Sequence, residues 1–124
     1  MNLNKFKISC LSIFFKILFL FYSLNAFSSE NLDYYDLYQK GDYNAAFRSA
    51  YKVSVSSDEP KAKYVIGNIL LNGLGDAKQN INRGYKLLSD ASNNNFGLAS
   101  LSIAKYLKDN NRCGSAISFY QKAK

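Results

Sequence analysis

The sequence predicts an all-α fold, an α-solenoid of about three antiparallel helix pairs that follows an N-terminal signal segment. Three observations lead to this prediction. Apolar residues recur three and four positions apart over long stretches, proline occurs once, and glycine and asparagine interrupt the pattern at intervals that suit helices of about 11 to 14 residues. We expect the three pairs to cover residues 30–55, 59–92 and 98–124.

The first pair is expected at residues 30–40 and 43–55. Ser29 and Asp42 are the predicted N-caps of its two helices, because a short polar side chain at that position accepts a hydrogen bond from a free backbone N–H. Gly41 can end the first helix in the left-handed conformation, which glycine adopts without strain. The two helices are therefore expected to be joined by a tight turn.

The second pair is expected to open at Asp58-Glu59-Pro60, where an N-cap aspartate, a second acid and a first-turn proline favour a helix start. Its first helix is expected to end before the loop at 73–77. Its second helix begins after Asn80 and ends at the three asparagines 93–95, which tolerate the left-handed turn. The two helices of the third pair are expected at residues 98–108 and 115–124.

The spacing of small and apolar residues repeats along the chain. From Ala62 such residues follow four, five and eight positions later, and the same spacing recurs 37 residues on, from Ala99. A second set starts at Gly84 and recurs 32 residues on, from Ala116. A period in the mid-thirties is typical of stacked helix-turn-helix units. The small residues expected to allow close approach of the helices are Ala62, Gly67, Gly84, Ala99, Ala104 and Ala116.

This pattern resembles the Sel-one-like repeat, a relative of the tetratricopeptide repeat, over roughly residues 37–124. The positions that match its pattern are Ala62, Ile66, Gly67, Gly73, Gly75, Asn80, Arg83, Gly84, Leu87, Ala91, Ser92 and Ala99. The chain departs from the family in three ways: its loop is one residue longer, Asp76 stands where an apolar residue is preferred, and Leu87 replaces an aromatic residue. The resemblance implies a stack of helix pairs, and fold alone does not fix function.

The N-terminal residues have the composition of a targeting segment. Two lysines precede an apolar stretch at 8–24, and Ala26-Phe27-Ser28 is a small-x-small triplet of the kind that signal peptidase accepts. We therefore expect residues 1–28 to be a signal peptide cleaved after Ser28, and residues 29–124 to be the helical repeat domain.

An uncleaved membrane anchor is the alternative, because residues 8–27 approach the length of a bilayer span. Lys16 lies inside this stretch and argues against a permanent span, since a charge at mid-bilayer is costly. Cleavage after Ala26 is the second choice of site. Cleavage implies an exported protein, periplasmic or secreted, and retention of the segment implies an inner-membrane anchor.

The composition argues against chemistry in this chain. There is no histidine, the commonest general base and metal ligand, so we expect no enzymatic activity, no cofactor and no metal. The net charge of +7 comes from 16 basic and 9 acidic residues, but the basic ones are scattered, so no nucleic-acid partner is expected. Cys113 is expected to pack in a turn between helices, with an intermolecular disulfide as the alternative.

The predicted function is protein–protein interaction or scaffolding, with a protein or peptide as partner. The alternative is a membrane-anchored structural accessory subunit of a larger complex. Tyr35, Tyr38, Tyr51 and Tyr120 fall on predicted inward-facing stripes, whereas Tyr64 does not. The first helices of stacked pairs line the concave side of such arrays. The residues predicted for a partner-binding surface there are Tyr64, Asn68, Asn72, Leu101 and Lys105, with Asp109 on the same face.

A second candidate contact lies in the last helix. Terminal repeats need a polar cap, because the last helix pair otherwise exposes its stacking face. We therefore expect Ala116 and Phe119 to lie on or beside an exposed apolar face, through which the domain self-associates or binds a partner. The alternative is that this helix folds its apolar side wholly onto the helix before it.

Overall fold

The structure, a computed structural model, describes residues 12–13, 15–17 and 33–124. Residues 12–13 and 15–17 are helical, and residues 33–124 form one compact unit. None of the helices in the described part of the chain has the length and apolarity of a membrane span. The predicted signal-peptide cleavage site and the predicted cap Ser29 lie outside the described residues.

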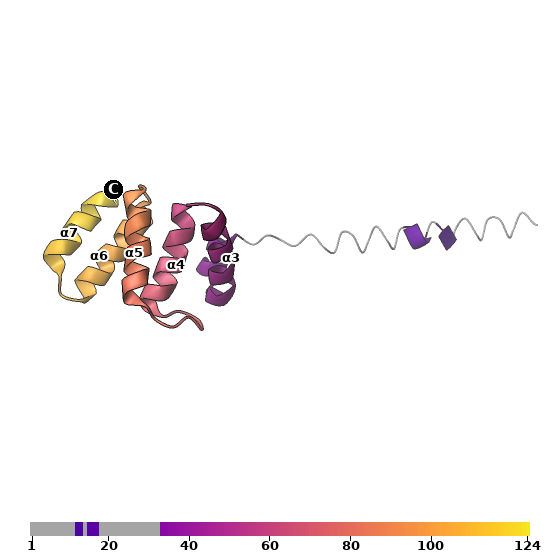
Figure 1. The fold of residues 1–124 in the computed structure, drawn as a ribbon, viewed down its shortest axis with the longest axis horizontal. Coiled ribbons are helices and arrows are strands. Elements are labelled where there is room, and N and C mark those ends of the chain that lie inside the picture. The colour runs from indigo at the N-terminus through magenta and orange to yellow at the C-terminus, as the bar shows by residue number, and fades with distance from the viewer. Residues whose placement is uncertain (1–11, 14, 18–32) are drawn as a thin grey trace, which may run out of the picture. The chain divides into compact units, whose positions relative to one another are not determined.

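The prediction of an all-helical fold is confirmed for the described residues, among which there is no β-strand. Consecutive helices lie side by side along the unit (Figure 1). The pairs α2–α3, α4–α5 and α6–α7 pack most extensively, and α3 on α4 and α5 on α6 join one pair to the next. The helices are α2 (Tyr34–Gln39), α3 (Tyr43–Ser56), α4 (Pro60–Asn72), α5 (Ile81–Asn93), α6 (Gly97–Asp109) and α7 (Cys113–Lys122).

The helix ends follow their sequence signals with three exceptions, one of which is the start of α7 at Cys113, two residues before the predicted Ser115. Asp42 and Asn80 cap α3 and α5 as predicted, each accepting a hydrogen bond from a backbone N–H three residues on. The cap of α2 is Asp33, whose carboxylate accepts from the Tyr35 N–H. The N-cap of α4 is Glu59 and not Asp58. The Glu59 carboxylate makes no cap bond and accepts a hydrogen bond from the Tyr34 hydroxyl, at 2.6 Å.

Two glycines let α4 and α5 approach closely, as predicted. A Cβ on Gly84 would stand 2.6 Å from the backbone nitrogen of Leu71 and 2.8 Å from the carbonyl oxygen of Gly67. A Cβ on Gly67 would stand 2.9 Å from the Cγ of Leu88. The absence of a side chain at both positions therefore sets the distance between the two helices.

Polar contacts join successive pairs. Between the first and second pairs, Asn44 donates to the Asp76 carboxylate at 2.7 Å and accepts from the Asp76 N–H at 2.9 Å. This contact gives Asp76 a structural role between the first two helix pairs. Lys61 pairs with Asp33 at 2.6 Å, and its hydrogen bond holds the pKa of the Asp33 carboxyl below its usual value. Between the second and third pairs, the buried hydroxyls of Ser92 and Ser100 lie 2.6 Å apart.

Three residues lie on the surface although the sequence predicts them inside. Tyr51 is 46 % exposed, because α3 buries only a narrow stripe of small residues and Tyr51 lies beside it, stacked on Phe47. Tyr120 is 39 % exposed, since α7 packs chiefly on one helix, α6. Cys113 is exposed because it is the first residue of α7 and not part of a packed turn.

Candidate functional site

A groove lies along the first helices of the three pairs. Besides their contacts along the chain, α2 touches α4 and α4 touches α6, so the three first helices lie next to one another. They enclose a cavity of about 200 Å³ that is open to solvent. We call this cavity the first-helix groove. It is lined by Tyr38 of α2, by Asn68, Leu71 and Asn72 of α4, and by Ser102, Lys105, Tyr106 and Asp109 of α6.

The structure brings three of the five residues predicted for a binding surface into this groove. Asn68, Asn72 and Lys105 line it together, although Asn68 and Lys105 are 37 residues apart. Leu101 is exposed but does not line the groove. Tyr64 does not line it either, and this residue is buried, with 8 % of its surface exposed.

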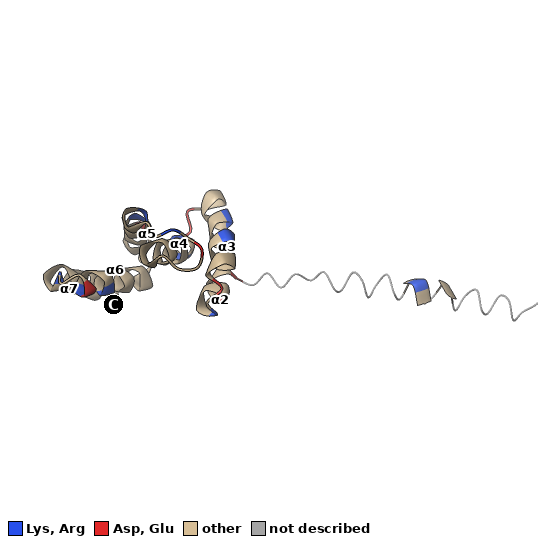
Figure 2. Cartoon of the chain, turned by 90° about the horizontal axis from the view of Figure 1, so that it is seen from below, with Lys and Arg blue, Asp and Glu red and all other residues tan. Residues whose placement is uncertain are grey.

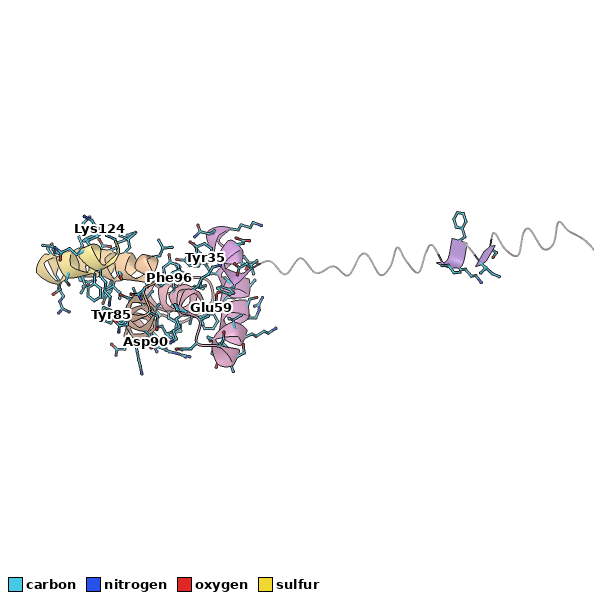
Figure 3. All side chains as sticks on the ribbon, turned by 90° about the horizontal axis from the view of Figure 1, so that it is seen from above. Tyr35, Glu59, Tyr85, Asp90, Phe96 and Lys124 are labelled. Atoms are coloured by element: carbon cyan, nitrogen blue, oxygen red, sulfur yellow. The ribbon has the colours of Figure 1, made fainter. Side chains whose placement is uncertain are left out.

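The prediction that Tyr64 lies on an open face is wrong, because α4 is surrounded by helices. The Tyr64 ring lies 6.3 Å from that of Tyr35, 6.0 Å from that of Tyr38 and 5.2 Å from that of Phe96. Tyr35 belongs to α2 and Phe96 is the N-cap residue of α6; both are labelled in Figure 3. Burial raises the pKa of the Tyr64 hydroxyl. Tyr64 therefore packs against Tyr38, which lines the groove.

Asn68 is also buried, at 4 % exposure, but it lines the groove. Its side-chain nitrogen has no hydrogen-bond partner among the residues that the structure describes. The nearby Ser102 and Asn68 side chains lower the pKa of the Tyr64 hydroxyl against the larger effect of burial, so the Asn68 amide lies against that hydroxyl. A buried amide left unpaired costs about 1–3 kcal/mol of folding free energy, so this position calls for an explanation.

The wall that α6 contributes is polar and carries both signs of charge. Lys105 and Asp109 lie one helical turn apart, and within residues 33–124 neither forms an ion pair. Tyr106 is held by an edge-to-face contact with Tyr85 of α5, at 6.3 Å between ring centroids. The groove thus has fixed aromatic edges and free polar groups between them.

Four groove residues are absent from the sequence-based candidates: Tyr38, Leu71, Ser102 and Tyr106. Tyr38 is assigned to the interior by its spacing, and burial does raise the pKa of its hydroxyl to about 12, yet one side of it borders the groove. Ser102 and Tyr106 lie at the same spacing as Lys105 and Asp109, so the helical period could have indicated them.

The prediction for the last helix needs correction. Ala116 is buried against α6, and Phe119 is half-buried and packed against the core, so neither forms an exposed apolar face. The apolar side chains that α7 does expose are Ile117, at 57 %, and Tyr120. A contact through this helix would therefore have to use Ile117 and Tyr120.

The chemistry that the described residues offer is hydrogen bonding and aromatic contact. They contain no group of three His, Cys, Asp or Glu side chains placed to hold a metal ion. Basic and acidic residues are spread over several helices, as Figure 2 shows. Compared with family models, with curated proteins and with solved structures, the chain gives no match. The functional argument therefore rests on the groove.

Proposed function

We propose that this chain is a non-enzymatic, exported helical-repeat protein, a short α-solenoid of the Sel-one-like kind, that binds a protein or peptide partner in the first-helix groove. The single observation that carries the proposal is the open groove of about 200 Å³ that side chains from all three first helices line together. The polar and charged side chains on its walls, among them Lys105 and Asp109, are available to groups of a ligand.

The packing around the groove supports a binding role. The central helix α4 is buried along most of its length, so the groove floor is rigid before a partner arrives. A rigid surface with aromatic edges binds without a large loss of conformational entropy. Tyr38 and Tyr106 are such edges, each fixed by another tyrosine ring.

Blocking the groove tests the proposal. Asn72 is exposed at its rim, so Asn72→Arg places a long side chain across the groove without disturbing the core. The matched control is Asn82→Arg, at an exposed position of α5 outside the groove. A photoreactive amino acid at position 105 of the full chain should crosslink a partner, and the same amino acid at the exposed position 86 of α5 should not.

We expect the crosslink at position 105 to disappear with Asn72→Arg and to persist with Asn82→Arg. Equal crosslinking at positions 105 and 86, or no effect of Asn72→Arg, would show that the groove is not the binding surface.

A further inference from the structure

The solvent-exposed side of α3 carries an apolar stripe beside two basic residues. Phe47, Tyr51 and Val55 follow one another at four-residue spacing, so they lie in one row along the helix. Tyr51 and Val55 are exposed, Val55 to 73 %, whereas Phe47 is half-buried and stacked on the Tyr51 ring. Arg48 and Lys52 are exposed and form the next row. We call these five residues the α3 face; none of them lines the first-helix groove.

The two cations of the α3 face are free to meet a ligand. Within residues 33–124 neither forms an ion pair, and α3 itself contains no acidic residue, as Figure 2 shows. The acids near the two ends of the helix are engaged elsewhere, because Asp42 caps α3 and Asp58 pairs with Lys63 at 2.5 Å. Asp76 is bonded to Asn44. The α3 face is therefore both apolar and positively charged.

This combination suits the surface of an anionic lipid bilayer. We propose that the α3 face binds such a surface, with Tyr51 and Val55 entering the interfacial layer and with Arg48 and Lys52 against the lipid phosphates. A helix that presents apolar side chains beside lysine or arginine lies in the plane of a membrane interface in this way. Tyrosine is favoured at that depth, because its ring is apolar and its hydroxyl stays among the headgroups.

The small area of the α3 face argues against a folded protein as its occupant. Specific protein interfaces use about 20–30 residues from each partner. The neighbouring helix α2 does not extend the apolar surface, since its exposed residues, Asp36 and Gln39, are polar. A bilayer needs no interface of fixed size, because lipids rearrange around the few side chains that enter and the attraction adds residue by residue.

Like charge argues against a second copy of this chain. Two α3 faces packed on each other would bring the two cations of each copy into one contact, which is unfavourable. The exposed apolar side chains of α7, Ile117 and Tyr120, are accompanied by Arg112, Lys122 and Lys124 and by no acid among residues 110–124. A contact between α3 of one copy and α7 of another would therefore also set cations against cations.

The test uses a fluorophore whose emission shifts to the blue in an apolar environment, attached at position 55 of the full chain. The attachment uses Val55→Cys, with Cys10→Ser and Cys113→Ser to remove the other thiols. This label reports on the α3 face alone, whichever other part of the chain meets the lipid. Vesicles of equal parts phosphatidylglycerol and phosphatidylcholine are compared with phosphatidylcholine alone, and Asn82→Cys carries the control label at an exposed position of α5.

The charge variant is Arg48→Gln with Lys52→Gln, and the matched control is Arg83→Gln with Lys86→Gln, at exposed positions of α5. We expect a blue shift at position 55 in the anionic vesicles, reversed by high salt, with none in the neutral vesicles and none at position 82. The charge variant should lower the ratio of shifted to unshifted label about 25-fold, at about 5-fold per cation, and the control should not. All these side chains are exposed, so the melting temperatures should match that of the parent chain.

Several results would overturn the inference. These are no shift at position 55 in anionic vesicles, an equal shift in neutral vesicles or at position 82, and a shift that the charge variant leaves unchanged. A shift produced by an acidic amphipathic helical peptide and not by the vesicles would assign the α3 face to a protein partner instead.

Discussion

The contact between α4 and α5 depends on Gly84, and replacing it with alanine gives a sharp test of the packing. The added Cβ would stand 2.6 Å from the Leu71 nitrogen, 2.8 Å from the Gly67 oxygen and 2.9 Å from the Leu71 Cα. All three are backbone atoms, so none can rotate away. The two helices must separate instead, and a gap of about 0.5–1 Å forfeits a quarter to a half of the dispersion energy at each contact.

The magnitude follows from two opposing effects. Alanine in a helix interior is favoured over glycine by about 1 kcal/mol. Overpacking of a core typically costs about 1–3 kcal/mol, and overlap with backbone belongs at the upper end of that range. We therefore expect Gly84→Ala to lower the free energy of unfolding by about 2 kcal/mol, which for a domain of roughly 90 residues lowers the melting temperature by about 8–16 °C.

The assay is thermal and urea unfolding of the full chain, followed by circular dichroism at the helical minimum. Gly114→Ala is the matched control, because a Cβ at this position of α7 meets nothing within 4 Å. It should leave stability unchanged or raise it by up to about 1 kcal/mol. If Gly84→Ala unfolds at or above the temperature of the parent chain, the argument for a glycine-dependent approach of α4 and α5 is refuted.

Three further predictions concern other parts of the chain. Tyr34→Phe removes the hydrogen bond to Glu59 and should lower the free energy of unfolding by about 1–2 kcal/mol in urea titration, with the Tyr51→Phe variant unchanged. Burial raises the pKa of Tyr38 to about 12, so its contribution to stability is complete below pH 10 and lost as the pH rises from 10 through 12; an ultraviolet titration in which every tyrosine ionises near pH 10 would contradict this. Export with cleavage after Ser28 predicts, by mass spectrometry, a chain that begins at Ser29, whereas an intact Met1 in a membrane fraction would favour the anchored alternative.

The order and type of the helices could be predicted because their signals are local. Asp42, Asn80 and Gly41 act through backbone groups within a few residues, so they work whatever surrounds them. The close approach at Gly67 and Gly84 was also predictable, since a repeat of small residues on neighbouring helices indicates contact.

The environment of α4 could not be predicted from one amphipathic stripe. That method assumes a helix with one wet side, and α4 contacts α2, α3, α5 and α6. The run Val65–Leu71 contains only glycine and one asparagine among apolar residues, and that composition indicates burial all round. Asn68 departs from this run, and the unusual placement of an amide there was the sequence signal for the groove.

Which residues line the rim of the groove depends on which helices contact one another. Tyr38 of α2 lines the groove because α2 contacts α4. These two helices are separated in the sequence by the whole of α3. The exposure of Tyr51 and Tyr120 has a related cause, because the width of a buried stripe is set by the number of neighbouring helices. Helical spacing predicts the direction in which a side chain points, but it does not predict how many helices surround the helix that carries it.

The helices α4 and α7 have different numbers of neighbouring helices, and this difference determines which of them unfolds locally first. In such an array each helix is held by its neighbours. Backbone amides exchange their hydrogens with solvent when part of the array unfolds, and this unfolding starts at the helix that has the fewest neighbours. Amides of α7, which packs chiefly on α6, should exchange first, and those of α4 only when the whole array opens. A peptide in the groove would contact α4 and α6 together and would therefore slow hydrogen exchange in α6. Binding in the groove would thus couple the unfolding of the C-terminal helix pair to that of α4.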